Sequence, residues 1–472
     1  MLDLFATLKM GAQSLQAQRT AVQVTGQNLA NVNNPAYARQ RVTFATSSAV
    51  PTQFGPQSTG VEVTGIQQLR DSILDGQIRQ ESSSSGYLNT MQSGLEQTQG
   101  YLGESVNQSS TAATSTSDGS TSPTGLGDDI NNLFSAFQSL AASPDSMTQR
   151  QALVGQAQTL ASRFNQVSQK LGVVKDSLNT SIGQGVKSAN QLLSDISDLN
   201  GQITQAEAGG GTANDLRDQR EQKLETLAGY VNTDVGTDAN GALTVSIGGV
   251  QMVDGSNQLD SLQTYDAGNG QILVQAATAG TGLPLTGGSI QGAIDTRDCE
   301  LKTLSGDLDK LAFNLITQVN IVHSNGFNFS GGNGANFFTG TSAATISVNG
   351  ALANDPTLIQ AAGVSGATGD NTVALQLANL ATQPITDLGN QTFSGSYSQT
   401  VADLGQSLQS VNQKVADQGV LQTMLGNQRE AVSGVSLDEE MTNLVQFQQA
   451  YNASARLIST ADQMLQTLIA IQ

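Results

Sequence analysis

Several residue types that commonly carry chemistry are scarce in this chain of 472 residues. It contains one cysteine, Cys299, one histidine, His323, and no tryptophan. A lone cysteine excludes an intramolecular disulfide and a cysteine cluster that would hold zinc or an iron–sulfur centre. A lone histidine excludes any metal site that needs two histidines from one chain. We therefore expect no metal site, no cofactor and no catalytic residues.

Charged and aromatic side chains are also few. Charged residues make up 12% of the chain, whereas about 25% is usual in a soluble domain. Twenty Lys and Arg against 39 Asp and Glu leave a net charge of −19. Nucleic acids and anionic membrane surfaces both require basic patches, so we expect neither as a partner. The low aromatic content, 4%, leaves little material for stacking platforms.

Targeting segments are the third class of feature that is missing. No run of about 18 apolar residues is present, which excludes a transmembrane helix. The segment Met1 to Ala12 has an acid at Asp3 and no basic region before an apolar run, unlike a Sec signal peptide. We expect a protein that is secreted without a cleaved signal peptide, if it is secreted at all.

What the chain does have is helical periodicity at both ends. Near the N-terminus, apolar residues recur every seven positions, which is typical of a coiled-coil seam. We expect this helix to end near Asn34, because the residue before a proline is kept out of the helical region. The C-terminal apolar stripe has a mean spacing of about 3.4 residues, which suits a left-handed supercoil.

Neither terminal helix has a partner that is adjacent in sequence. The economical solution is that the two helices pair with each other and then with copies on other subunits. The residues that we expect at this subunit interface are Leu8, Leu15, Val22, Leu29, Leu437, Met441, Leu444, Phe447, Tyr451, Ile458, Leu465 and Leu468.

The region after the first helix carries weaker signals. Residues 40–44 alternate like an edge strand, and residues 46–60 carry two prolines and are expected to form a loop. Helix is expected again after Gly65, with leucines on a seven-residue grid as far as position 102. Residues 103–127 are rich in Ser, Thr, Gly and Asn and indicate a linker.

A short helix is then expected over residues 130–140, with Asp128 or Asp129 as its cap. The clearest periodicity follows from Leu153 to Ile203, where apolar residues alternate spacings of four and three, with a slip near Gly183 and Gly185. This pattern predicts one helix of about 50 residues, or two in series, spanning about 75 Å.

Period-two alternation replaces the helical pattern in the middle of the chain. After a helix over residues 215–228, the segment 231–288 is rich in glycine, and Asn240-Gly241 signals a hairpin turn. Helix resumes from Ser289 to Asn325, followed by loops and short strands that four phenylalanines anchor: Phe327, Phe329, Phe337 and Phe338.

The last third of the chain returns to helix. A heptad stripe covers residues 401–415, and Ser433 to Val435 interrupt it. Ser436 and Glu439 then have the spacing of a capping box, in which each side chain bonds the free backbone N–H of the other residue.

These patterns together predict a mainly α fold with a small inserted β domain. The molecule should be elongated, with long antiparallel coiled-coil-like helices and the N- and C-terminal helices paired at one end. The predicted domains are a terminal helical assembly domain (1–65 with 433–472), a helical rod domain (66–230 with 289–432) and an inserted β domain (231–288).

Motifs near both ends resemble those of a known family. Residues 28–40 read NLANVNNPAYARQ, and residues 433–440 read SGVSLDEE, followed by QQAY at 448–451 and TAD at 460–462. Both ends are similar to the signatures of the bacterial flagellar rod, hook and hook-associated axial proteins. The C-terminal form, with DLRDQR at 215–220 and VNIVHSNG at 319–326, is similar to members that join the hook to the filament. Asn34 and Ala36 depart from the Thr and Gly that are usual around this proline.

The resemblance implies an extracellular structural protein at the hook–filament junction, required for filament attachment and motility. It would be exported unfolded and uncleaved through the flagellar type III apparatus. The partners it implies are further copies of itself in a ring, the hook protein, the second junction protein (hook-associated protein 3) and a flagellar export chaperone.

Four features invite sharper interpretations that we weigh against plainer ones. His323 lies at a helix end without a nucleophile at motif spacing, which favours a structural or surface role. Acidic neighbours should disfavour the thiolate of Cys299. Residues 238–241 echo a calcium loop but lack its glutamate. Glu439 and Glu440 should diverge on a helix, so capping and the helix dipole are favoured over a carboxylate pair.

Other functions stay open at this point. A flagellar hook or rod protein would share the terminal motifs, although the long helix over residues 145–208 favours the junction class. A flagellum-associated wall hydrolase or protease would be an enzyme, and purified protein without hydrolytic activity would exclude it. An adhesin-like β insertion would lose surface binding, but not motility, when residues 236–285 are deleted.

Overall fold

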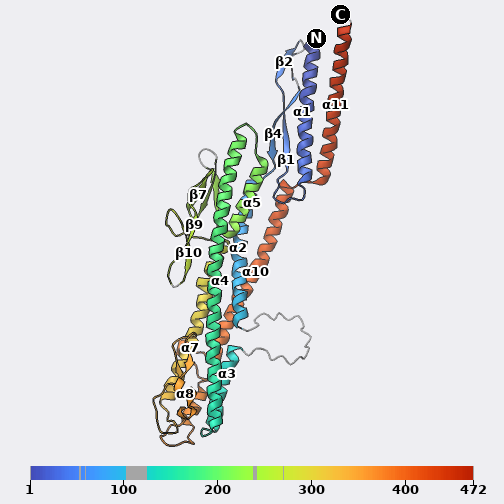
Figure 1. The fold of residues 1–472 in the computed structure, drawn as a ribbon. Helices are drawn as coiled ribbons and strands as arrows, with labels where there is room; N and C mark the ends of the chain where they lie inside the picture. Colours follow the sequence, from blue (N-terminus) through green and yellow to red (C-terminus); the bar gives the residue numbers. More distant parts are fainter. Residues whose placement is uncertain are drawn as a thin grey trace.

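The computed structural model describes residues 2–52, 55–58, 60–102, 125–237, 242–268 and 270–470. Helix α1 (Leu2–Ala30) and helix α11 (Leu437–Ala470) lie side by side at one end of an elongated molecule, with both termini at the same tip (Figure 1). The predicted pairing of the terminal helices is therefore confirmed.

Small residues allow α1 and α11 to approach closely. A Cβ atom placed on Gly11 would lie 2.8 Å from Cγ1 of Ile458, so only glycine fits this crossing without displacement. Three residues further along, the Oγ atoms of Ser14 and Ser454 are 2.9 Å apart. The seam thus combines apolar contact with hydroxyl hydrogen bonding, in agreement with its dilution by polar residues.

Two hairpins follow α1. Strand β1 (Gln40–Thr46) pairs antiparallel with β4 (Val61–Gln68), and β2 (Ala49–Thr52) pairs with β3 (Gly55–Ser58). The predicted strand at 40–44 is confirmed, whereas the loop expected over 46–60 is wrong. The helix expected after Gly65 is confirmed as α2 (Ser72–Leu102), although it begins only after β4 has ended. Prolines are tolerated in edge strands because their missing N–H faces away from the ladder. Residues 61–68 gain their strand conformation from distant pairing with β1.

The rod is built from long helices. It contains α2 (Ser72–Leu102), α3 (Leu126–Ala142), α4 (Met147–Glu207), α5 (Asn214–Tyr230) and α10 (Phe393–Ser433). Helix α4 is continuous over 61 residues, about 90 Å at 1.5 Å per residue, which settles the choice between one helix and two. At the predicted slip, Gly185 packs beneath Ile290, where a Cβ would lie 2.8 Å from Cγ1.

The start of α3 differs from the expected cap. Its N-cap is Gly125, and Asp128 and Asp129 lie in the first turn instead. Leu126 is fully buried, and the helix begins at this residue, four residues before the expected start. The carboxylate of Asp129 accepts a hydrogen bond from Nε of Arg163 (3.1 Å) on α4.

The predicted β segment is present and packs on α4. Its four-stranded sheet has the order β5 (Asp234–Thr237), β6 (Leu243–Ile247), β7 (Val250–Asp254), β8 (Asn257–Gln258), and β9 (Leu262–Asp266) pairs with β10 (Ile272–Ala276). Asn190 of α4 binds both the N–H and the C=O of Leu262, at 2.8 Å each. The expected Asn240-Gly241 turn lies outside the described residues.

The chain then returns through α6 (Gly288–Asp295), a π-helical turn η1 (Thr296–Leu301) and α7 (Lys302–Ser324). The far end of the rod holds β11 (Phe338–Thr339), β12 (Ser347–Val348), α8 (Gly350–Asn354), η2 (Pro356–Leu358), α9 (Thr372–Asn379) and η3 (Thr386–Leu388). Phe337 and Phe338 are fully buried there, while Phe327 and Phe329 are half-buried.

Within the described residues, buried apolar side chains form two separate clusters. The large one runs through the rod, the β insertion and the far end. The small one joins Ala21 and Val24 of α1 to Val42 of β1, with Phe447 of α11 packed against it. The fold is mainly α, elongated and carries small β insertions, as predicted.

Candidate functional site

The two terminal signature motifs meet at a single guanidinium group. Arg39 precedes β1, and Glu439 and Glu440 occupy the first turn of α11. Nη1 of Arg39 lies 2.7 Å from Oε2 of Glu439, and its Nη2 lies 2.7 Å from Oε1 of Glu440. The expectation that the two carboxylates diverge is therefore wrong, because the planar fork of arginine spans both. Glu440 is 2% exposed and Glu439 62%.

Asn28 connects this ion pair to the N-terminal segment. Its Nδ2 donates to Oε2 of Glu440 (3.0 Å) and to the backbone O of Gln40 (2.9 Å). Its Oδ1 accepts from the backbone N of Gln40 (3.0 Å) and from the hydroxyl of Tyr37 (2.9 Å). A buried amide is costly unless it is bonded, and here both its ends have partners.

The turn around Pro35 closes without glycine. The side-chain Oδ1 of Asn34 accepts from the backbone N of Ala36 (3.2 Å), and its backbone O accepts from the N of Tyr37 (3.1 Å). An asparagine side chain forms such turns readily. The departure from the usual Thr and Gly is therefore compatible with the motif.

The corner between α10 and α11 is held by backbone and side-chain bonds. The N of Arg39 donates to the O of Ser433 (2.9 Å). Of the expected capping box, the N of Glu439 donates to Oγ of Ser436 at a long 3.5 Å. The Glu439 carboxylate binds Arg39 instead of turning back, so the box is confirmed in only one of its two bonds.

The motif at 215–220 begins α5 and receives the N-terminal segment. Oδ2 of Asp218 accepts from the backbone N of Ala38 (3.2 Å), and its Oδ1 accepts from Nη2 of Arg70 (3.1 Å). Gln40 adds a bond from Nε2 to Oδ1 of Asp215 (2.9 Å) and accepts from Nδ2 of Asn214 (3.2 Å). We call the region formed by residues 28–40, 68–70, 214–218 and 433–440 the joint.

Burial sets the electrostatics of the joint. Burial raises the pKa of Asp218 to about 6, against the lowering effects of the Ala38 amide and the Arg70 guanidinium. Burial, and then the charges of Asp215, Asp218 and Glu440, raise the pKa of the Tyr37 hydroxyl. At neutral pH the joint therefore holds a neutral phenol beside an anion that is costly to desolvate.

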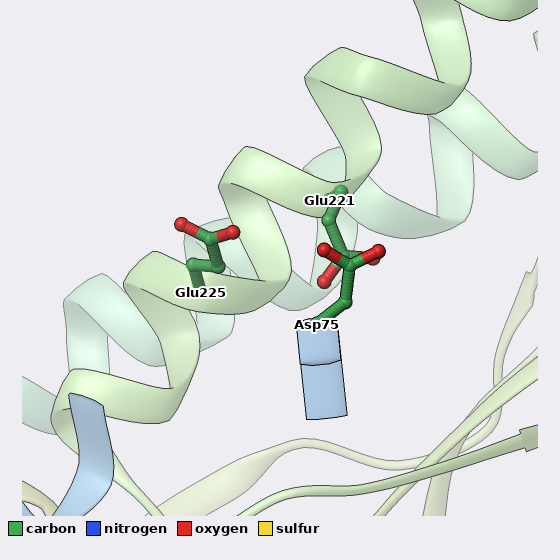
Figure 2. Close-up of side chains that lie close together, drawn as sticks. All are labelled: Asp75, Glu221 and Glu225. Atoms are coloured by element: carbon green, nitrogen blue, oxygen red, sulfur yellow. The ribbon is translucent and has the colours of Figure 1, made fainter. Parts of the chain in front are cut away.

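Three carboxylates close to the joint have the spacing of a metal site. Asp75 of α2 faces Glu221 of α5, and Glu225 lies one turn along α5 (Figure 2). An arginine contacts each of them: Arg70 lies 3.3 Å from Asp75, Arg79 pairs with Glu221, and Arg429 of α10 pairs with Glu225. This arrangement is a charge network that ties α2, α5 and α10 together.

The predicted interface residues lie in two environments. The half-buried ones on α1 are Leu8, Leu15, Val22 and Leu29, and those on α11 are Leu444, Phe447, Tyr451, Ile458 and Leu465. Leu437 and Met441 are 51% and 52% exposed. The side chain of Leu468 lies outside the described part of the chain.

Sequence reasoning missed part of the exposed apolar surface of α11. Val445 is 49% exposed and follows Met441 by four residues, and Met464 and Ile469 are exposed as well. The signal for Val445 was its spacing of four and eight residues from Met441 and Leu437. The sequence pattern predicts a single apolar stripe, whereas Met441 and Val445 form a second exposed line beside it.

The lone histidine and the lone cysteine have plain environments. His323 is fully buried, with Nδ1 2.8 Å from the O of Ala335 and Nε2 accepting from the N of Gln360 (3.0 Å). Nδ1 therefore carries the proton, and burial lowers the pKa of His323 to about 4. Its expected structural role is confirmed. Partial burial and acidic neighbours raise the pKa of the exposed Cys299, as expected. Residues 238–241 lie outside the described residues.

Among the described helices, none combines the length and the apolar character needed to cross a membrane. Residues 116–338 match a family model described as the flagellar hook-associated protein FlgK helical domain. Residues 428–471 match the flagellar basal body rod FlgEFG protein C-terminal model.

The chain is similar to whole proteins over nearly its full length. It is 30% identical to flagellar hook-associated protein 1 of Bacillus subtilis (strain 168), over 99% of this chain and 98% of that protein. The protein of the same name from Escherichia coli (strain K12) is 24% identical, over 97% and 98%. The solved flagellar hook junction protein FlgK from Burkholderia pseudomallei shares the fold, with a TM-score of 0.66 at 16% identity, covering 76% of this chain and 100% of that chain.

Proposed function

Because the chain belongs to the flagellar hook-associated protein 1 family, we propose that it forms the structural junction between the flagellar hook and the filament. It is a structural component of the bacterial flagellum. It is mainly helical, and none of its described helices is long and apolar enough to cross a membrane. The observation that carries the function is the match over 99% of the chain to a hook-associated protein 1. The joint adds a structural role for the motifs that define this family.

We propose that the exposed apolar side chains of α11 contact neighbouring subunits. Leu437, Met441 and Val445 recur every four residues and are each about half exposed. Residues at this spacing share one face of a helix, and partner helices bury such faces. The predicted interface residues that are half-buried in the α1–α11 seam would then add their exposed parts to the same contact with neighbouring subunits.

The partners proposed for this surface are those of an axial protein. They are copies of the same chain in a ring, the hook protein on one side and hook-associated protein 3 on the other. Before export, a flagellar chaperone would cover the apolar face of α11, as a groove covers an amphipathic helix. The net charge of −19 disfavours nucleic acid and anionic membranes as further partners.

Location and chemistry follow from the same proposal. The protein would be extracellular, exported by the flagellar type III apparatus without a cleaved signal peptide. We infer that it acts by binding alone and not as an enzyme. In support, the one histidine has both ring nitrogens engaged by backbone groups.

A hook or rod structural protein is the alternative. The match of residues 428–471 to a basal body rod C-terminal model favours it. However, this match covers only α11 and the end of α10, whereas the hook-associated model matches residues 116–338.

The test is electron microscopy of a deletion strain, with the medium assayed for flagellin. We expect complete hooks without filaments, and monomeric flagellin released into the medium. Absent or malformed hooks would move the protein to the hook or rod class. Intact filaments in the deletion strain would contradict the junction function altogether.

A further inference from the structure

A groove runs along the rod over helix α2. Two adjoining hollows of about 440 and 420 Å³ share Tyr87, Leu88 and Lys414 and so form one continuous groove, which we call the rod groove. Helix α10 forms one wall, and the π-helical turn η1 together with residues 286–287 forms the other. The apolar side chains that line it are Leu88, Met91, Val411 and Leu421.

The rim of the rod groove is acidic. Glu300 of η1 and Asp403 and Asp417 of α10 line it, together with Lys414. Both aspartates are exposed, and each accepts a hydrogen bond from a glutamine one turn away on α10, at 2.7 and 3.2 Å. Glutamine is neutral, so these bonds leave the negative charge uncompensated. A partner that fits this groove is therefore apolar in the middle and basic at its ends.

The outer face of α4 has this character. Val173, Thr180 and Lys187 recur every seven residues and share one side of the helix; all three are exposed, Val173 by 50%. Lys170, also exposed, flanks Val173 one turn earlier. The two lysines lie about 26 Å apart along the helix. Asp176 lies between them, as Lys414 lies between the two aspartates of the rod groove.

The lower charges of the two surfaces stand at the same height on the rod. Nζ of Lys170 lies 5.7 Å from the ring centroid of Tyr101 on α2. Gln92 of α2 donates to Asn412 of the antiparallel α10 (2.8 Å). Nine residues from this bond along each helix, toward the far end of the rod, stand Tyr101 and Asp403. Lys170 and Asp403 are therefore level with each other.

The upper charges match in the same way. A Cβ on Gly185 would lie 2.8 Å from a side chain of α6, and a Cβ on Gly292 of α6 would lie 2.5 Å from the backbone O of Tyr87. Tyr87 lines the same hollow as Asp417. Lys187 follows Gly185 by two residues, so it stands about level with Asp417. Helices α4 and α10 both run from the far end toward the joint (Figure 1).

We propose that neighbouring copies of the chain dock rod to rod, with the outer face of α4 of one copy seated in the rod groove of the next. This contact deepens the proposed junction function and rests on it, because a ring places copies side by side, pointing the same way and at one height. Lys170 then meets Asp403, Lys187 meets Asp417, and Val173 enters the apolar lining. The two surfaces differ, so the contact is heterologous and repeats around a ring.

Disulfide cross-linking in isolated flagella tests the contact. The chain carries Cys299→Ser, which removes the exposed native thiol, with Val173→Cys on α4 and Met91→Cys in the rod groove. Oxidation should produce a ladder of covalent oligomers, because each thiol meets the other kind on a neighbouring copy. In the control, Ile73→Cys replaces Met91→Cys. Ile73 is 74% exposed at the start of α2, outside the groove, and should give no ladder.

The cross-linking result separates this contact from the junction function itself. Variant chains that enter flagella but give no ladder would overturn the rod docking and leave the junction function standing. Absence of the unsubstituted chain from isolated flagella would refute both.

Charge reversal provides a second test that needs no new thiols. Asp403→Lys with Asp417→Lys should lower incorporation into flagella at least about tenfold, because like charges then face each other across the contact. Lys170→Asp with Lys187→Asp should lower it similarly. All four substitutions in one chain restore opposite charges on the two surfaces and should restore incorporation.

A matched control excludes a general effect of charge. Glu96→Lys with Asp387→Lys shifts the net charge by the same amount as the first pair, at exposed positions outside both surfaces, and should leave incorporation unchanged. Circular dichroism of the purified variants shows whether each one is folded. A folded chain with all four reversals that still fails to enter flagella would contradict the proposal.

Discussion

At the scale of single residues, the joint depends on one buried carboxylate, Glu440, whose partners Asn28 and Arg39 lie far away in the chain. Asn28 and Glu440 are 412 residues apart, yet they share a hydrogen bond of 3.0 Å. The motifs that contain them were recognisable in the sequence as separate signatures. Their contact was not, because spacing rules describe neighbours within one element and say nothing of which elements meet.

Glu440→Ala should destabilise the packing of α1 and β1 against α11. It leaves Arg39 and Asn28 without their carboxylate partner, and breaking a buried pair costs about 3 kcal/mol. Glu439→Ala is the matched control, because that carboxylate is 62% exposed and should cost less than about 1 kcal/mol. Urea unfolding followed by circular dichroism measures both. Equal losses would show that burial of the pair contributes nothing.

The buried His323 makes the free energy of unfolding fall as the pH is lowered. Its pKa is lowered from 6.5 to about 4, so its contribution is complete above pH 6.5 and is lost as the pH falls toward 4. The largest loss is about 3 kcal/mol. His323→Gln should therefore lose less stability than the parent protein between pH 7 and pH 4. Unfolding free energies at both pH values check this, and parallel losses would contradict it.

At the scale of elements, helices were predicted well and strands poorly. In α4, the apolar residues that recur at spacings of four and three are the ones that the helix buries. The long helix could therefore be identified from sequence alone. By contrast, β4 owes its conformation to β1, with Val42 opposite Ile66. Its sequence, interrupted by Gly65, carries too weak a local signal. The same explanation holds for the hairpin of β2 and β3, which sequence analysis assigned to a loop.

Two glycines of α4 separate packing from helix propensity. A Cβ at Gly183 meets nothing within 4 Å, whereas one at Gly185 would lie 2.8 Å from Cγ1 of Ile290. Gly183→Ala should stabilise the protein by up to about 1 kcal/mol. Gly185→Ala should destabilise it by about 1–3 kcal/mol. Thermal unfolding of the two variants distinguishes them, and equal effects would mean that α6 moves aside freely.

At the scale of the whole molecule, the terminal helices are paired at one tip, and the far end carries short helices and strands joined by loops (Figure 1). The sequence predicted this nesting because neither amphipathic end had a local partner. The division into 1–65 with 433–472, 66–230 with 289–432, and 231–288 stays a prediction, as does the role of the β insertion.

Substitution of the exposed apolar residues of α11 should impair assembly more than folding. Met441→Asp with Val445→Asp should change the unfolding free energy by less than about 1 kcal/mol, because both side chains are about half exposed. Incorporation into flagella and motility should be lost. Gln446→Asp, which adds charge at an exposed polar position on the same helix, is the control. Normal incorporation of the double variant would refute the interface proposal.

The bond between Asn28 and Glu440 also makes closure of the joint depend on the presence of α11. A polypeptide that stops before residue 440 lacks the carboxylate that Asn28 and Arg39 require. Prematurely terminated chains therefore cannot close the joint, however well their rods fold. The closed joint in this way unites residues that are 412 positions apart in the chain, so it forms only after the helix that carries Glu440 has been made.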